Sequence, residues 1–417
     1  MGYTIIEKII RDHSDDKDIY PGKVVWIDLD YRTARDFGGP NVVKNFIKEY
    51  PGEKVADISR TFFTFDTVAP AKTIPYANNQ HLCRKFSEEQ GVKVYDVDQG
   101  IGSHLAIEKG YVIPGTTLVG TDSHLNILGA VCAFGQGMGD QDITFAFKTG
   151  KTWFEIPETI KVVFEGKLRN GLSAKDLTLA YVREMGANGA LGKAVEFYGE
   201  EIDKLSLAGR ITLASMITET GGIVGLIPPS SDILEYCKVR SGKKEVPDYK
   251  ADENASYSDI ITIDLDKVDY LISAPPKPDN VVNVGDVRGR KVDSVFLGSC
   301  TNGRIEDMRE AADILRDRKV KENVMMRVVP ATKEVYGEML KEGIVELFYN
   351  AGVILTNPGC GGCAQGQVGM TGEGEVQVST GNRNFKGKQG SGDTYLCSPA
   401  VAAACAVKGK ICTPEDL

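Results

Sequence analysis

Three cysteines stand in turns where their thiols could bind a metal centre. Cys360 and Cys363 lie in a glycine-rich turn that follows an apolar strand expected over 351–355. Pro358 fixes the entry to this turn, and the glycines let backbone N–H groups approach sulfur. The C-x-x-C spacing also occurs in thioredoxin-like redox sites and in zinc sites, so the pair alone leaves those two alternatives open beside an iron–sulfur centre.

A third cysteine favours the metal interpretation. Cys300 lies in the turn 298–303, between an expected strand and an expected amphipathic helix, and a helix N-terminus favours an anion such as a thiolate. Three thiolates without a fourth suit a four-iron cluster that leaves one iron open for substrate, whereas a structural zinc site is closed. Buried or zinc-binding cysteines are the alternative.

Asp122, Ser123 and His124 could act on a bound ligand. They directly follow an apolar strand expected over 117–120, and open α/β sheets bind ligands at the carboxyl ends of their strands. We expect the small-residue segment 129–139 to form the next helix. A helix cap with a surface histidine is the alternative. Three further residues share this ambiguity: Asp66, His104 and Glu219.

A basic, turn-rich segment near the C-terminus could bind a carboxylate. The segment 381–388 contains Asn382, Arg383 and Lys388. Arginine grips a carboxylate through two N–H groups, and lysine adds a point charge. A solvated surface loop is the alternative interpretation.

The elements that must position these residues alternate between strand-like and helix-like patterns. The expected strands are 23–27, 92–95, 117–120, 159–164, 260–265, 292–297, 324–329 and 353–355. The expected helices are the N-terminal segment, 41–50, 78–91, 174–185, 207–220, 305–316 and 333–342. This βαβ alternation predicts an α/β protein with mostly parallel sheets.

The length of 417 residues exceeds what one hydrophobic core usually serves and predicts two or three domains. The strand over 159–164 opens a second unit, and the Pro- and Lys-rich segment 274–279 has the composition of a linker. We therefore expect three α/β/α domains at 1–157, 158–283 and 284–417, the last of which carries the three cysteines.

Composition argues against several classes of protein. The chain is 42% hydrophobic and 26% charged, and it has no apolar run of the roughly 20 residues that a membrane span needs. Charges interrupt the N-terminus too early for a signal peptide, so we expect a cytoplasmic protein. A net charge of −9 without a long basic run argues against nucleic-acid binding. Nine scattered cysteines, an odd number, argue against a disulfide framework.

Five motifs in order along the whole chain resemble the aconitase family, in particular its large subunits of 3-isopropylmalate dehydratase and homoaconitase type. The motifs are GTDSH at 120–124, TGKTWF at 149–154, GSCTNG at 298–303, NPGC at 357–360 with Cys363, and STGNRNF at 379–385. The resemblance implies an aconitase-like fold, with its α/β domains arranged around an iron–sulfur cluster.

The resemblance also implies roles for individual residues. Three would ligate a [4Fe–4S] cluster: Cys300, Cys360 and Cys363. Five would be catalytic: Asp66, His104, Asp122, His124 and Glu219. Four would bind substrate: Ser123, Asn382, Arg383 and Lys388. The implied activity is that of a hydro-lyase acting on a 2-hydroxy dicarboxylic acid of the 3-isopropylmalate class, with the cluster as Lewis acid.

A separate small subunit is the expected partner. The family's serine base and further arginines sit in a swivelling C-terminal domain, for which these 417 residues leave no room. We therefore expect this chain to be inactive alone.

Several positions depart from the family pattern around the substrate. Thr67 and Ser103 stand where histidines are usual, Lys388 replaces an arginine, and Arg35 precedes Asp36 where relatives often have His-Asp. These changes keep open a different substituted malate, such as 2,3-dimethylmalate or citramalate, or the homoaconitase reaction. A non-catalytic cluster or zinc protein that serves as sensor or scaffold is the alternative from another class.

Overall fold

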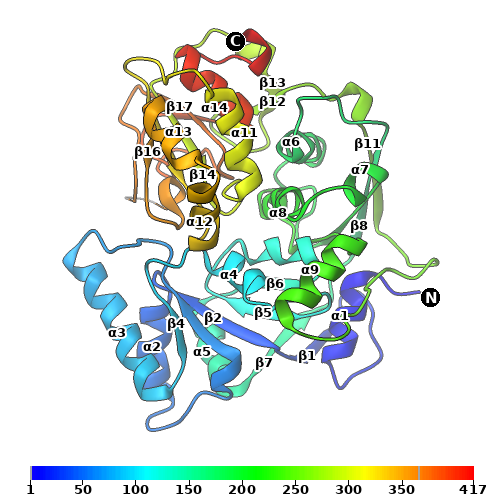
Figure 1. Ribbon diagram of the computed structural model, residues 1–417. Coiled ribbons are helices and arrows are strands. Elements are labelled where there is room, and N and C mark those ends of the chain that lie inside the picture. The colour runs from blue at the N-terminus through cyan, green and yellow to red at the C-terminus, as the bar shows by residue number, and fades with distance from the viewer. Residues whose placement is uncertain (1, 365–366) are drawn as a thin grey trace.

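The computed structural model describes residues 2–364 and 367–417. Three large sheets occupy successive parts of the chain (Figure 1). In this view the N-terminal part lies at the bottom in blue to cyan, the middle part at the right in green, and the C-terminal part at the top in yellow to red.

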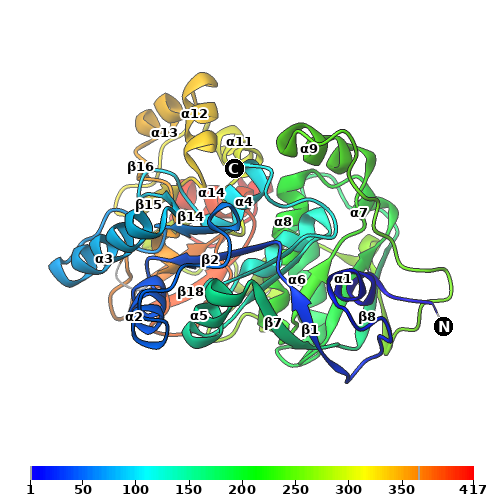
Figure 2. The same ribbon diagram turned by 90° about the horizontal axis from the view of Figure 1, so that it is seen from below.

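The first sheet has five parallel strands in the order β4-β3-β2-β5-β6. They are β2 (Tyr31–Arg35), β3 (Thr61–Thr64), β4 (Lys93–Tyr95), β5 (Thr117–Gly120) and β6 (Phe134–Gly137). The helices of this part are α2 (Gly39–Glu49), α3 (Ile74–Gln90), α4 (Gly102–Glu108) and α5 (Asp140–Thr149). Helices α2 and α5 lie side by side below β2 in Figure 2.

An antiparallel ribbon and the first helix connect this part to the next. The ribbon pairs β1 (Val24–Asp28) with β7 (Lys151–Glu155). Helix α1 (Ile5–His13) begins with a capping box between Thr4 and Glu7. Its Ile5 N–H donates to Glu196 Oε1 of the second sheet at 2.6 Å.

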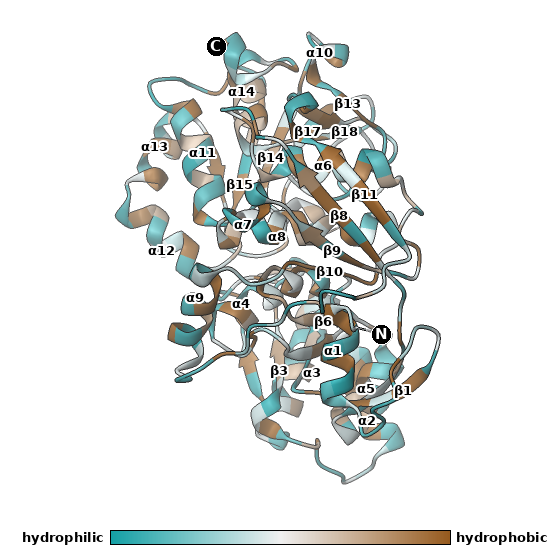
Figure 3. Ribbon diagram, turned by 90° about the vertical axis from the view of Figure 1, so that its right-hand side faces the viewer, coloured by the Kyte–Doolittle hydropathy of each residue, from teal (hydrophilic) through white to brown (hydrophobic). Residues whose placement is uncertain are grey.

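The second sheet is fully parallel, in the order β10-β9-β8-β11. Its strands are β8 (Thr159–Glu165), β9 (Ala194–Tyr198), β10 (Val224–Leu226) and β11 (Asp259–Asp264). Its helices are α6 (Ala174–Met185), α7 (Glu200–Asp203), α8 (Leu207–Ser215) and α9 (Ser231–Ser241). Figure 3 shows hydrophobic residues gathered on β8 and β9, as expected for strands buried between helices.

The third sheet has seven strands in the order β13-β12-β18-β17-β14-β15-β16. They are β12 (Leu271–Ser273), β13 (Val281–Asn283), β14 (Ser294–Gly298), β15 (Met325–Val329), β16 (Ile354–Leu355), β17 (Val376–Ser379) and β18 (Asp393–Leu396). Strand β12 runs antiparallel to both neighbours, whereas the strands from β18 to β16 are parallel. The helices are α10 (Val284–Val287), α11 (Ile305–Leu315), α12 (Lys333–Lys341), α13 (Ile344–Ala351) and α14 (Pro399–Lys408).

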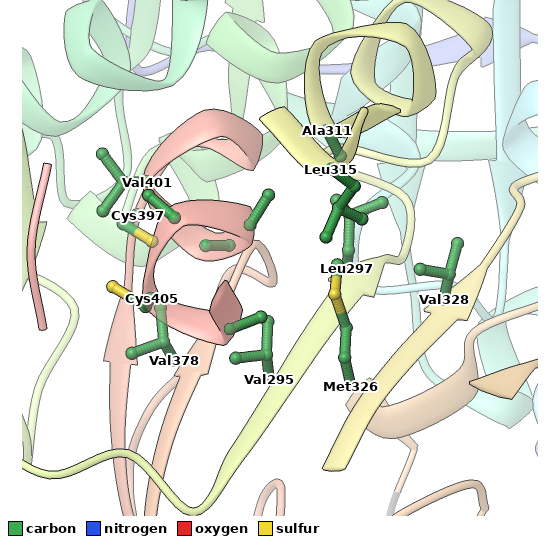
Figure 4. Packing of buried hydrophobic residues seen from close by; sticks show 14 of the residues in the cluster. Val295, Leu297, Ala311, Leu315, Met326, Val328, Val378, Cys397, Val401 and Cys405 are labelled. Carbon is green, nitrogen blue, oxygen red and sulfur yellow. The ribbon is translucent and has the colours of Figure 1, made fainter. Parts of the chain in front are cut away.

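Helices α11 and α14 cover the core of this sheet (Figure 4). Leu315 of α11 and Val401 of α14 pack toward Val295, Leu297 and other side chains of the central strands. Small residues in α14, whose alanines are almost all fully buried, let this helix approach closely. The turns that follow β14, β15 and β17 are thereby held on a rigid base.

Most predicted elements are confirmed within a few residues, but one is wrong. The segment 129–139 is not a helix: a 3-10 helix over Leu125–Val131 is followed by strand β6. The reason is that Phe134–Gly137 pairs with β5 as the edge strand of the sheet. Gly135 fits there because a Cβ would lie 2.1 Å from the carbonyl oxygen of Leu125. The helix expected over 207–220 is α8 followed by a 3-10 turn over Met216–Thr220.

The predicted domain limits remain a prediction. Strands β12 and β13 precede residue 284, yet β12 pairs with β18 in the third sheet. Among the residues that the structure describes, no helix is long and apolar enough to cross a membrane.

Candidate active site

A cavity of about 620 Å³ lies between loops of the first and third sheets. Its wall contains most of the predicted site residues: Asp122, Ser123, His124, Cys300, Cys360, Cys363, Asn382, Arg383 and Lys388. The other three predicted site residues lie behind this wall and form hydrogen bonds with residues in it. They are Asp66, His104 and Glu219.

Strand ends bring these distant residues together. β2 ends at Arg35, and β3, β5 and β14 each end two residues before a predicted site residue: Asp66, Asp122 and Cys300. The carboxyl ends of neighbouring parallel strands lie at one edge of a sheet, which is where α/β proteins place their sites. The predicted placement of Asp122 after β5 is thus confirmed.

The three cysteines of the wall are buried. Cys300, Cys360 and Cys363 expose 8%, 9% and 9% of their surface. Burial raises the pKa of Cys300 to about 12 and also raises that of Cys360 well above its usual value. A bound metal would reverse this effect, because a coordinated thiol loses its proton.

The described residues contain no group of ligands for a single metal ion. Within 2–364 and 367–417, no three His, Cys, Asp or Glu side chains are arranged around a single metal ion. A zinc site would need such an arrangement, whereas the ligands of a cluster stand further apart around its several irons. All nine cysteines, which lie within these ranges, are free thiols.

The side-chain amide of Asn382 forms hydrogen bonds with two of the three thiols. Its Nδ2 donates to Cys300 Sγ at 3.3 Å, and the Cys363 thiol donates to its Oδ1 at 3.8 Å. Gly381 lies so close that an added Cβ would stand 3.0 Å from Cys363 Sγ. The segment that follows β17 therefore forms a cradle for two of the three thiols, which is the environment of iron–sulfur ligands.

Arg35 links both buried acids to the third thiol. Its Nε lies 2.7 Å from Asp66 Oδ1 and its Nη1 lies 2.9 Å from Asp122 Oδ1. Its Nη2 donates to Cys360 Sγ. One guanidinium thus uses all three of its nitrogens on the site, as its planar fork permits.

The pKa values of the two acids shift in opposite directions. Burial raises the pKa of Asp66 to about 6, although Arg35 opposes the shift. Burial also acts on Asp122, but there Arg35 and His124 outweigh it and lower the pKa. Asp122 therefore stays ionised at neutral pH, and as pH falls Asp66 takes up its proton before Asp122 does.

Glu219 holds a histidine and an arginine at one oxygen. Its Oε1 lies 3.1 Å from His124 Nε2 and 2.7 Å from Arg383 Nε. The other ring nitrogen of His124, Nδ1, lies 3.2 Å from Ser123 Oγ. Burial works to raise the pKa of Glu219, but His124 and Arg383 lower it on balance. Glu219 therefore fixes the orientation of both the His124 ring and the Arg383 guanidinium.

His104 lies outside the cavity wall. Its Nε2 lies 2.9 Å from the backbone oxygen of Cys300 and must donate there. Its Nδ1 is buried without a hydrogen-bond partner in the described part of the chain. Burial, helped by the charge of Arg304, lowers the pKa of His104 to about 3. This neutral imidazole positions the backbone that carries Cys300.

Comparison with known proteins decides the family. A model of the Aconitase family (aconitate hydratase) matches residues 7–409. The chain belongs to the aconitase family. A probable 3-isopropylmalate dehydratase large subunit of Methanothermobacter thermautotrophicus is 42% identical over 420 residues, with both chains fully covered. A 3-isopropylmalate dehydratase large subunit of Methanopyrus kandleri is 40% identical over 418 residues, covering 100% of this chain and 99% of its own.

A solved structure supports the aconitase-type fold. The holo-form of aconitase X from Thermococcus kodakaraensis has a TM-score of 0.55 at 12% identity, with 93% of each chain covered. The expected α/β fold with mostly parallel sheets is confirmed.

This aconitase-family site contains residues that the sequence prediction missed. The sequence marks Arg35 only as a departure from the family pattern, whereas in the structure it contacts three site residues. Phe37, Tyr76, Phe385 and Lys386 also line the cavity. The basic, turn-rich pattern of 381–388 was the signal available for Lys386, whereas no local signal marks Phe37 or Tyr76.

Proposed function

We propose that this chain is the large, cluster-bearing subunit of a hydro-lyase for a 2-hydroxy dicarboxylic acid of the 3-isopropylmalate class. The observation that carries the proposal is that three buried thiols share one cavity wall with four basic side chains, those of Arg35, Arg383, Lys386 and Lys388. The names of the two large-subunit relatives support this substrate class.

The cofactor proposed for this site is a [4Fe–4S] cluster held by Cys300, Cys360 and Cys363. Such a cluster supplies a Lewis acid for the substrate hydroxyl and carboxylate. The sulfur-facing amide of Asn382 and the guanidinium of Arg35 support this ligand set.

Arg383 and Lys388 would bind the substrate carboxylates. Glu219 holds the Nε of Arg383, and the two terminal nitrogens of this guanidinium make no hydrogen bond within the described residues. They are available for a bidentate carboxylate contact. Lys388 adds charge without that fork.

His124 would give a proton to the departing hydroxyl. It lines the cavity and is held by Glu219 and Ser123 on its two nitrogens. Asp122 Oδ1 accepts from the His124 backbone N–H at 3.0 Å, and Arg35 links Asp122 to Asp66. Removal of the proton next to the carboxylate needs a base, which we place on a separate small subunit.

A second candidate is the same reaction on another substituted malate. It is favoured by the substrate-facing wall, where Thr67 and Arg35 stand in place of the family's usual histidines and Phe37, Val68 and Tyr76 add apolar surface. An apolar wall suits an alkyl substituent, whose size would choose between isopropylmalate and a methylated malate.

Co-expression with a small subunit tests both candidates. A panel of 2-hydroxy dicarboxylic acids with different 3-substituents should include one that yields alkene absorbance. The Cys360→Ala variant serves as the inactive control. If no member of the panel reacts while the cluster is intact, the enzyme proposal is wrong and the non-catalytic alternative takes its place.

A further inference from the structure

Lys175 is a fully buried cation outside the cavity wall. It is the second residue of α6 and exposes 0% of its surface. Burial of a charge is costly, and the first turn of a helix repels a cation. Two features of its position therefore act against this charge, and some interaction must compensate for them.

The neighbouring acids do not provide that compensation. Asp176 accepts hydrogen bonds from the backbone N–H groups of Ser173 and Leu271 at 2.9 and 3.1 Å. Asp307 accepts from Asn302 Nδ2 and from the Arg304 N–H, both at 2.8 Å. Neither carboxylate forms an ion pair with Lys175 in the described part of the chain. Burial lowers the pKa of Lys175 to about 8.

The ammonium group instead holds the segment that cradles the thiols. Its Nζ donates to the backbone oxygens of Thr380 at 3.1 Å and Gly381 at 2.7 Å. Gly381 packs against Cys363 Sγ, and the next residue, Asn382, donates to Cys300 Sγ. One peptide unit thus separates the residue that Lys175 holds from the side chain that contacts the sulfurs.

Charge balance supplies the missing compensation. Three cysteine thiolates carry three negative charges, and a [4Fe–4S] core in its resting state carries two positive ones, so the bound group has a net negative charge. Cys363 and Cys300 of this ligand set are among the groups whose negative charge would raise the pKa of Lys175. Cys397 has the same effect when ionised, but it is outside the set and burial raises its own pKa. A buried cation beside this group is then paired rather than isolated.

We propose that Lys175 is a positioning residue that fixes the Thr380–Gly381 backbone, which leads into Asn382, and supplies the buried positive charge that balances the thiolate-bound cluster. This inference rests on the proposed cluster. It predicts opposite effects of the lysine on the empty and the loaded protein. Without the cluster the buried charge of Lys175 destabilises the protein, and with the cluster it stabilises the bound group.

The test compares wild type with Lys175→Met, Lys175→Gln and a matched control. Lys333→Met is the control, because Lys333 is also in the first turn of a helix but is 64% exposed. Each empty protein is melted. Each anaerobically reconstituted protein is then assayed for iron release to a chelator and for the reduction potential of the cluster by EPR-monitored titration.

We expect the empty Lys175→Met protein to melt at or above the wild-type temperature. Once loaded, it should release iron at least about tenfold faster, the factor that corresponds to 1.36 kcal/mol, and its potential should be more negative because a positive charge is gone. Lys175→Gln keeps hydrogen-bond donors but has no charge. It should therefore show the same shift in reduction potential as Lys175→Met, and it should release iron more slowly than Lys175→Met does. Lys333→Met should match wild type.

A purely structural lysine would give the reverse pattern. If the empty Lys175→Met protein melts lower while iron release and potential match wild type, the inference is wrong. If Lys175→Met does not fold, the reduction potential of Lys175→Gln tests the inference. A more negative potential than wild type supports it, and an unchanged potential contradicts it. Wild type that takes up no iron and sulfide would instead refute the proposed function itself.

Discussion

The guanidinium of Arg35 lies 2.7 Å from the carboxylate of Asp66, measured from Nε to Oδ1. The same group lies 2.9 Å from Asp122 and also donates to Cys360. Asp66 and Asp122 are almost fully buried, so Arg35 is the cation that makes their presence together tolerable.

Arg35→Met should therefore destabilise the protein by about 3–5 kcal/mol, the usual cost of leaving a buried charge without its partner. Chemical denaturation of the cluster-free protein measures this change. Arg309→Met is the control, since Arg309 pairs with Glu342 at the surface and should cost less than about 1 kcal/mol. Equal effects of the two substitutions would show that Arg35 does not compensate the buried acids.

Glu219→Gln should lower kcat/KM of the assembled enzyme by about 10²-fold or more, because His124 and Arg383 lose their common anionic partner. The amide keeps the shape of the side chain, but Arg383 loses its ionic partner, so the variant is assayed well below its own melting temperature. Glu49→Gln, at a surface carboxylate that is 49% exposed, is the matched control. An unchanged kcat/KM for Glu219→Gln would remove His124 from the proposed acid role.

Lys388→Met should raise KM about tenfold with a smaller change in kcat, since a carboxylate contact made in both ground and transition states acts on binding. Lys388→Arg should restore binding because the guanidinium is also a cation. Lys72→Met is the control, as Lys72 lies outside this cavity wall. A fall in kcat alone would contradict the binding role.

His13, which is not part of the cavity wall, should make the free energy of unfolding depend on pH. Its Nδ1 and Nε2 lie 2.8 Å from the Ile9 carbonyl and from Asp30, and both nitrogens donate only in the imidazolium. Burial works to lower the pKa of His13, but these contacts raise it on balance. The contribution is therefore fully present below about pH 6.5, the unfolded value, and is lost as pH rises through the raised folded pKa.

The check on His13 is a comparison of wild type with His13→Gln in free energy of unfolding. The difference should be larger at about pH 6 than at about pH 9, by roughly 1 kcal/mol or less for a partly exposed pair. Asp30, whose pKa is lowered on balance by His13 against the effect of burial, stays ionised over this range. A pH-independent difference would contradict the assignment.

Local pattern was sufficient for the turns that carry the cysteines. Cys300 follows β14 and precedes α11, as expected from an apolar run, a glycine turn and an amphipathic helix. The turn with Cys360 also follows a strand, but β16 covers only Ile354–Leu355 because α13 extends to Ala351. The core under these turns is made of the periodic apolar residues that sequence patterns reveal best.

Polar contacts between residues far apart in the chain could not be predicted from sequence patterns. β2 was missed because it carries the buried Arg32, whose Nε donates to Thr61 at 3.1 Å, so its residues lack apolar alternation. Arg35 meets Asp66, Asp122 and Cys360 across 31, 87 and 325 residues. Such contacts depend on how the sheets meet, which no local spacing encodes.

The central claim is that Cys300, Cys360 and Cys363 hold an iron–sulfur cluster. The direct measurement is iron and acid-labile sulfide per chain after anaerobic reconstitution, together with visible absorbance. Wild type should contain about four irons and as many sulfides with a broad absorbance, and Cys360→Ala should lose them. Bound zinc without sulfide in wild type would contradict the account.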